Sequence, residues 1–147
     1  MRRPFKILGC VMLFTVLMPG GARADDKDVI EYREHIMKTL NEQASAIGMI
    51  LSGAAPDTHL VEHIEIISLM ADIALRSFEP KVQGGQAKPQ VWTDWADFSK
   101  RMNEFARNAT AVAKTAKEKG KDAATANILD ALPCKSCHDI YRDDSKK

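Results

Sequence analysis

The residues most suited to chemistry are two cysteines and a histidine near the C-terminus, in the segment Cys134-Lys135-Ser136-Cys137-His138. This C-x-x-C-H pattern is the attachment signature of c-type haem. Each thiol adds to one haem vinyl group, and two intervening residues let both thiols reach one edge of the porphyrin. The histidine next to the second thiol is then the expected proximal iron ligand. The pattern predicts one covalently attached haem c per chain.

Two other interpretations of the same residues stay open. A structural zinc site is less well supported, because such sites use four ligands, usually from two such pairs, and this chain has one pair. A disulfide between Cys134 and Cys137 gives no reason for His138 to follow. Either alternative would make the chain a non-haem zinc or redox module, which a haem stain on a denaturing gel distinguishes from a haem protein.

The first 24 residues have the pattern of a secretory signal peptide. A basic start (1–6) precedes an apolar stretch (7–18), and Ala22-Arg23-Ala24 provides an A-x-A cleavage site. Twelve apolar residues are too few to span a bilayer, which needs about 20. We expect cleavage after Ala24, export to the periplasm, and a mature domain of residues 25–147 with no membrane span.

The composition fits an exported and mildly acidic protein. Loss of the signal removes four of the 21 basic residues and none of the 20 acidic ones, which leaves a net charge of −3. Such a chain lacks the excess positive charge typical of nucleic-acid-binding domains. Cys10 precedes most of the apolar stretch, which disfavours a lipoprotein anchor there. An oxidising compartment outside the cytoplasm is also where c-type haem is attached.

Apolar residues recur at spacings of three and four along three segments, as on one face of an α-helix. The three stripes are Ile30, Arg33, Met37, Leu40, Ala44, Ile47 and Leu51; Leu60, Ile64, Ile67, Ala71, Ala74 and Phe78; and Trp92, Trp95, Phe98, Met102, Phe105, Ala109 and Val112. Pro56, Gly84-Gly85 and Gly120 are expected to interrupt the helices. We therefore predict three amphipathic helices before residue 120.

A fourth helix is predicted from about Asp122 through Leu132 into the haem motif. Pro133 predicts a kink or a restart, because proline lacks an N–H and clashes with the preceding turn. No segment alternates with period two, so no sheet is expected. Four amphipathic helices with mostly short links predict an all-α fold, an antiparallel four-helix bundle with one haem near the end of the last helix.

Met37 and Arg33 lie one turn apart on the first stripe and bear on mechanism. A methionine thioether as the sixth iron ligand gives a low-spin couple suited to electron transfer; ordinary core filling is the alternative for Met37. A charge within an apolar stripe needs a partner or a route to solvent. A haem propionate would pair with Arg33 in a bidentate geometry, and snorkelling to solvent is the alternative.

Three elements, in this order, resemble the cytochrome c′ family over essentially the whole mature region. They are Tyr32-Arg33 with Met37; Ala87-Lys88-Pro89-Gln90-Val91-Trp92-Thr93-Asp94 with Phe98; and Cys134-x-x-Cys137-His138-Asp139-Ile140-Tyr141-Arg142. The resemblance implies a four-helix bundle that usually forms a homodimer through its first two helices. It implies covalent roles for both cysteines, a proximal role for His138, a propionate contact for Arg33, and a place beside the proximal imidazole for Arg142.

The residue at position 37 separates two branches of that family. High-spin cytochromes c′ mostly have a non-ligating residue there, whereas in low-spin relatives of the cytochrome c-556 type a methionine binds iron. Residues 33–38 resemble the low-spin version. We therefore predict a His/Met-ligated electron carrier that serves periplasmic redox partner proteins and is not an enzyme. The alternative is a five-coordinate protein that binds nitric oxide or carbon monoxide, with Met37 as a non-ligating distal residue.

Weaker candidates are better explained as surface groups. His59 and His63 are spaced for one helix face and a metal ion, but two solvated histidines explain them more simply. His35 points away from the Met37 face and is a poor second choice as axial ligand. The lysine run within residues 114–121 suits the end of a helix. The sequence leaves the choice between monomer and dimer undecided.

Overall fold

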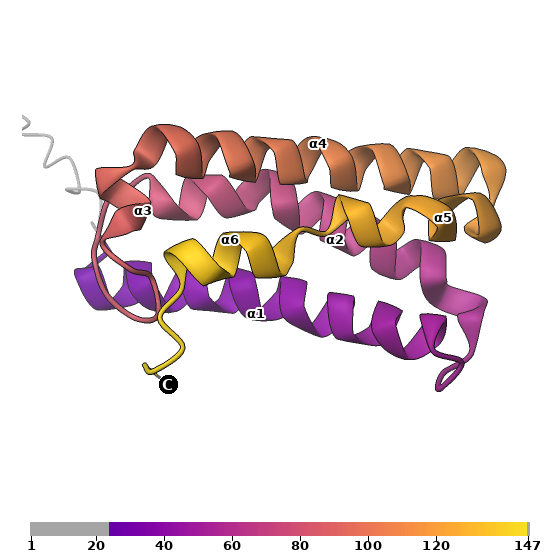
Figure 1. Ribbon diagram of the computed structural model, residues 1–147. Coiled ribbons are helices and arrows are strands. Elements are labelled where there is room, and N and C mark those ends of the chain that lie inside the picture. Colours follow the sequence, from indigo (N-terminus) through magenta and orange to yellow (C-terminus); the bar gives the residue numbers. More distant parts are fainter. Residues whose placement is uncertain (1–23, 147) are drawn as a thin grey trace, which may run out of the picture.

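The computed structural model describes residues 24–146, and it is all-helical, as predicted. Cys10 and the predicted signal sequence before Ala24 lie outside these residues, and cleavage after Ala24 stays a prediction. The helices are α1 (Asp26–Leu51), α2 (Leu60–Ala74), α3 (Gln90–Thr93), α4 (Trp95–Lys119), α5 (Lys121–Ala131) and α6 (Cys134–Tyr141). Short 3₁₀ turns, η1 (Asp57–His59) and η2 (Leu75–Phe78), flank α2. The predicted four-helix bundle is confirmed, with α5 and α6 together forming its fourth arm (Figure 1).

Helix α1 begins where its sequence provides a cap. The side chain of Asp25 accepts a hydrogen bond from the backbone N–H of Asp28 at 2.8 Å, and acidic residues in the first turn suit the positive end of the helix dipole. The helix ends at Leu51 with Ser52 as its C-cap, and Gly53 then adopts a positive φ of 76°. This long first helix provides one wall of the site described below.

Arg33, Leu40 and Ile47 of the predicted stripe on α1 are buried, and Ile36, which the stripe did not include, is buried with them. Ile36 is 3% exposed and belongs to the core, whereas Met37 is half-buried and packs at the margin of the core. Successive helical residues differ by about 100° in direction, so Ile36 and Met37 point to different parts of the interior. The sequence pattern therefore placed Met37 deeper than the structure does.

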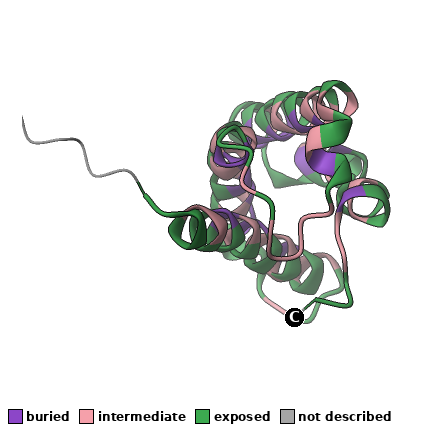
Figure 2. Cartoon of the chain, turned by 90° about the vertical axis from the view of Figure 1, so that its left-hand side faces the viewer, coloured by how far each residue is buried: buried purple, intermediate pink, exposed green. Residues whose placement is uncertain are grey.

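Helix α2 packs between α1 and α4, and α4 packs on α5. Every residue of the predicted second stripe, from Leu60 to Phe78, is buried. Figure 2 shows the buried surfaces turned toward the interior of the bundle and the exposed surfaces turned outward. None of the described helices is long and apolar enough to cross a membrane.

Pro133 divides the last arm of the bundle, as expected. Helix α5 ends at Ala131, and α6 begins at Cys134 after a short bend in which the N–H of Cys134 bonds to the carbonyl of Leu132 at 2.8 Å. Since proline has no N–H to give to the preceding turn, a continuous helix is not available here. The haem motif therefore occupies its own short helix.

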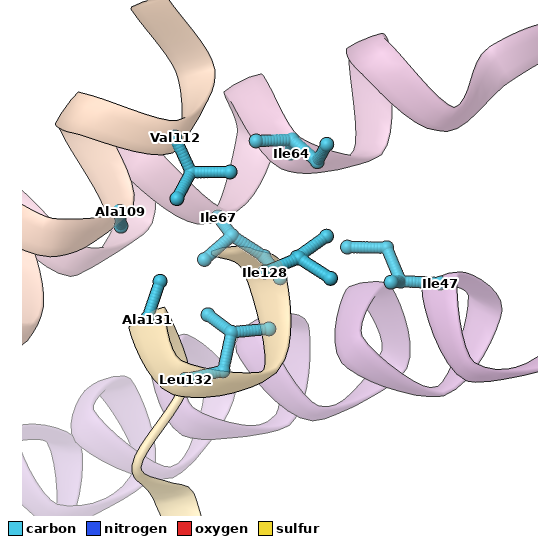
Figure 3. Close-up of a pocket in the computed structure, with 8 residues that line it drawn as sticks. All are labelled: Ile47, Ile64, Ile67, Ala109, Val112, Ile128, Ala131 and Leu132. Atoms are coloured by element: carbon cyan, nitrogen blue, oxygen red, sulfur yellow. The ribbon is translucent and has the colours of Figure 1, made fainter. Parts of the chain in front are cut away.

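Helix α5 is held by Ile128, which projects toward residues of three other helices (Figure 3). An apolar cavity of about 10 Å³ remains beside it, enough for at most one water molecule. It is lined by Ile47, Ile64, Ile67, Ala109, Val112, Ile128, Ala131 and Leu132. The helices are therefore closely packed around Ile128, and the cavity is too small to hold a haem.

The packing predicts a large difference between two adjacent residues of α5. Ile128→Ala removes a side chain that is 1% exposed, and we expect it to lower the free energy of unfolding by about 2–5 kcal/mol. Leu129 is 76% exposed, so Leu129→Ala should change it by less than about 0.5 kcal/mol. Urea unfolding measures both, and equal effects would contradict this packing.

Candidate haem site

Helix α6 presents the two cysteines of the C-x-x-C-H motif as free thiols, Cys134 exposed and Cys137 half-buried. The disulfide alternative is therefore not formed. Residues three apart on a helix lie on neighbouring surface, so both sulfurs can meet one flat group. Desolvation by neighbouring side chains raises the pKa of both thiols, and the positive charge of Arg101 opposes this at Cys137. The two thiols fit covalent attachment of a haem.

His138 is half-buried, and its two ring nitrogens have different surroundings. Nδ1 lies 3.0 Å from Nη1 of Arg142, whereas Nε2 makes no hydrogen bond with the described residues. Burial, and next the charge of Arg142, lower the pKa of the imidazole. Binding of a metal through Nε2 requires a neutral ring with its proton on Nδ1, so on ligation Nδ1–H would face the Arg142 guanidinium and Arg142 could not donate to it. His138 thus fits the predicted place of the proximal ligand, and ligation itself stays a prediction.

Arg142 links the proximal histidine to the C-terminal segment. Its Nε donates to Oδ1 of Asp144 at 2.6 Å while Nη1 faces His138. The backbone of Arg142 also forms an antiparallel bridge with Ala87. The guanidinium is therefore held from two directions against the imidazole. A contact between Arg142 and haem stays a prediction.

Arg33 is 3% exposed, so it does not snorkel to solvent. Nη1 donates to the carbonyl of Val82 at 3.0 Å, and Nη2 donates to the carbonyl of Gly84 at 2.9 Å. Its guanidinium carbon also lies 5.0 Å from the ring centre of Phe78 and 5.2 Å from that of Trp92. Burial lowers the pKa of the guanidinium. Three of its five N–H groups are left, so the expected propionate contact stays a prediction.

Met37 lies one turn after Arg33 on α1, and its half-buried side chain packs against the core. The side chain is apolar and unbranched, which suits both a thioether ligand and a flexible distal wall. The structure places Met37 where either role is open, and its ligation stays a prediction.

A polar network beside Cys137 was not predicted from the sequence. The hydroxyl of Tyr141 donates to Oδ2 of Asp97 at 2.6 Å, and Nε of Arg101 pairs with the same oxygen. Burial and this hydrogen bond raise the pKa of Tyr141 to about 12. The Arg101 and Tyr141 hydrogen bonds lower the pKa of Asp97. The network fastens the end of α6 to α4, and its only sequence signal was the i, i+4 charge pair on α4.

Aromatic rings fill the space beneath the end of α6. Phe98 makes edge-on contacts with Phe78 at 4.9 Å and with Tyr141 at 5.1 Å, measured between ring centres. Trp95 lies 5.7 Å from Phe98, and Trp92 donates from its indole N–H to the carbonyl of Phe78 at 3.1 Å. The predicted aromatic stripe is therefore mainly core that supports the haem-bearing helix.

The remaining histidines are engaged elsewhere. His63 Nδ1 lies 2.7 Å from Oε1 of Gln43. His59 is in the 3₁₀ turn and lies 3.8 Å from Glu62, and exposed His35 lies 3.7 Å from Glu31. Within residues 24–146 no group of three or more metal-ligating side chains comes together. The described residues therefore provide no evidence for a metal site outside the haem motif.

The chain is similar in sequence to known cytochromes. A family model described as "Cytochrome C'" matches residues 28–142. The chain is 32% identical over 126 residues to the cytochrome c′ of Rubrivivax gelatinosus, covering 79% of this chain and 95% of the relative. It is 28% identical over 140 residues to the cytochrome c-556 of Agrobacterium fabrum, covering 93% and 94%.

A solved structure is also similar. It is the nitric oxide complex of a mutant of cytochrome c prime from Alcaligenes xylosoxidans, with a TM-score of 0.74 and 25% sequence identity. The similarity covers 84% of this chain and all of that one. The fold of this chain is thus shared with a solved cytochrome c prime.

The network around Asp97 predicts a pH-dependent contribution to stability. Its carboxyl pKa is lower in the folded protein than the usual value of about 3.9. The contribution is therefore fully present above about pH 4 and is lost as the pH falls through the folded pKa. We expect the haem-loaded wild type to melt at a higher temperature than Asp97→Asn at pH 7, and the difference to narrow below pH 4.

The exposed carboxylate of Asp130 provides the control for loss of one surface charge. Asp130→Asn should leave the melting temperature nearly unchanged throughout. A difference between wild type and Asp97→Asn that is equally large at pH 3 and pH 7 would contradict the assignment.

Proposed function

Because the chain belongs to the cytochrome c′ family, which carries one covalently attached haem c per chain, we propose that it binds nitric oxide or carbon monoxide at a five-coordinate haem. It is a c-type cytochrome, and haem when bound supplies a one-electron couple and an open position for a small gas. Cys134 and Cys137 would hold the group, and Nε2 of His138 would be its proximal ligand.

The contact between Arg142 and His138 carries this proposal. A metal-ligating histidine normally donates its other ring N–H to a carbonyl or carboxylate, which makes the ligand more basic. Here the neighbour of Nδ1 is a guanidinium at 3.0 Å, which can only donate. A cation in place of an acceptor makes the imidazole a weaker donor to iron. A weak proximal bond favours the high-spin, five-coordinate state over a low-spin one.

The distal side supports the same proposal. Ile36, and not Met37, takes the core-facing position on α1, so Met37 lies at the margin of the packed interior. A flexible apolar side chain there can exclude water and large ligands while giving way to a diatomic gas. The similar solved structure is itself described as a nitric oxide complex. We assign Met37 the role of a distal gate.

The sequence analysis favoured a different sixth ligand, and that function stays the second candidate. In it Met37 binds iron, and the protein is a low-spin electron carrier. The 28% identity to a cytochrome c-556 favours it. It requires the half-buried thioether to reach the iron.

Export to the periplasm fits the predicted signal peptide and the attachment chemistry of c-type haem. A redox protein of that compartment would reduce the iron, and we assign the chain no catalytic role of its own. A homodimer through α1 and α2 is supported by Leu69 on α2, which is 70% exposed. These assignments are part of the proposal.

Removal of the Met37 side chain tests the choice between the two candidates. We expect the oxidised wild type and Met37→Ala to share one high-spin spectrum. Carbon monoxide should bind the reduced variant about tenfold faster, the effect of lowering a steric barrier by about 1.4 kcal/mol. Met49→Ala, at an exposed position on the same helix, is the control. A far-red charge-transfer band that Met37→Ala abolishes would establish the low-spin carrier instead.

Replacement of the two thiols tests haem attachment itself. The double variant Cys134→Ser, Cys137→Ser should lose all haem staining on a denaturing gel, because no thioether bond can then form. Ser136→Ala changes the same turn of α6 and should keep the stain. A wild type without stain would favour the zinc or redox alternatives.

A further inference from the structure

We propose that Arg33 is a positioning residue that sets the separation between α1 and α6, the two walls of the haem site. It does so by clamping residues 82–88, here called the strap, onto α1. The other end of the strap is bonded to the end of α6. This inference rests on the proposed haem function but not on the choice between its two coordination states.

At its first end the strap is held tightly against α1. The guanidinium of Arg33 binds the carbonyls of both Val82 and Gly84. Gly84 has a φ of 143°, and a Cβ on it would lie 2.5 Å from Cδ1 of Ile30. A larger residue at this position would therefore be both strained and too close to the helix. The strap and α1 are fitted to each other here.

At its second end the strap pairs with the chain that leaves α6. The N–H of Lys88 donates to the carbonyl of Tyr141 at 2.9 Å, and the N–H of Asp143 donates to the carbonyl of Gln86 at 2.8 Å. Ala87 forms the bridge to Arg142 between them. In Figure 1 this connection, which precedes α3, runs past the beginning of α1 to the C-terminal tail.

The two anchors are placed one helical turn from the two residues that would face the haem iron. Arg33 precedes Met37 by four residues on α1, and Arg142, the C-cap of α6, follows His138 by four residues. Because one turn of helix is stiff, a change in the position of the strap would move Met37 on α1 and His138 on α6 by a similar amount. We infer that the strap keeps the distal and proximal side chains in register.

The clamp requires arginine in particular. Two terminal nitrogens of a planar group reach two carbonyls at once while its faces cover Phe78 and Trp92. Lysine has a single side-chain nitrogen and no planar face. Arg33→Lys therefore keeps the positive charge but cannot bond to both carbonyls in the same way. This makes Arg33→Lys a test of geometry and not of charge.

The test compares haem-loaded wild type with Arg33→Lys and with Gly84→Ala. Arg33→Lys breaks the clamp at the guanidinium, and Gly84→Ala lifts the strap from α1 while leaving Arg33 in place. In both variants we expect the amide hydrogens of Lys88 and Asp143 to exchange at least about tenfold faster, as local opening becomes easier. Arg76→Lys, at an exposed arginine on η2, is the control and should not change them.

Carbon monoxide association with the reduced proteins provides the second readout. The strap requires the rate to shift in the same direction in Arg33→Lys and Gly84→Ala. A shift in Arg33→Lys alone would mean that Arg33 acts through a propionate, and unchanged exchange at Lys88 and Asp143 would mean that it holds no strap. Either result overturns the proposal. The exchange readout does not depend on the coordination state, so failure of the proposed function would be recognised separately.

Discussion

A charged group buried among helices must find its partners outside them, and Arg33 is such a group. The carbonyls within a helix are already bonded to N–H groups of the next turn, so free acceptors occur only at helix ends and in loops. Arg33 uses two carbonyls of the 82–88 strap. Satisfying this one guanidinium therefore brings an irregular segment against α1, and the rest of the haem site is arranged around that contact.

The helix that carries the haem motif, α6, is not continuous with the long helices of the bundle. Pro133 separates α6 from α5, whose own position is determined by Ile128 in the core. Two independent contacts then hold the end of α6: the hydrogen bond of Tyr141 to Asp97 on α4, and the backbone pairing with the strap. A short helix held at its end by side-chain and loop contacts can be adjusted without disturbing the packing of the long helices.

The surroundings of the axial residues bear on function more than the residue types do. Histidine and methionine at these positions suit an electron carrier, and the likeness of residues 33–38 to low-spin relatives favoured that function. In the folded chain Ile36 occupies the core-facing position beside Met37, and a guanidinium faces Nδ1 of His138. Both features support a weakly ligated iron that binds a gas. The relatives of this chain include both a cytochrome c′ and a cytochrome c-556, so family membership alone does not choose between the two functions.

The sequence alone determined whatever depends on local pattern. The haem motif, the helices and the break at Pro133 each follow from residues within a few positions of one another, and all were predictable. The depth of Met37, the partners of Arg33 and the Asp97–Tyr141 bond were decided by the tertiary structure. The Arg33 and Tyr141 contacts join residues 44 to 51 positions apart, and the burial of Ile36 beside the predicted stripe depends on which helices pack against α1. Spacing along the chain specifies neither the contacts nor the extra buried position, because both are set by how the helices pack.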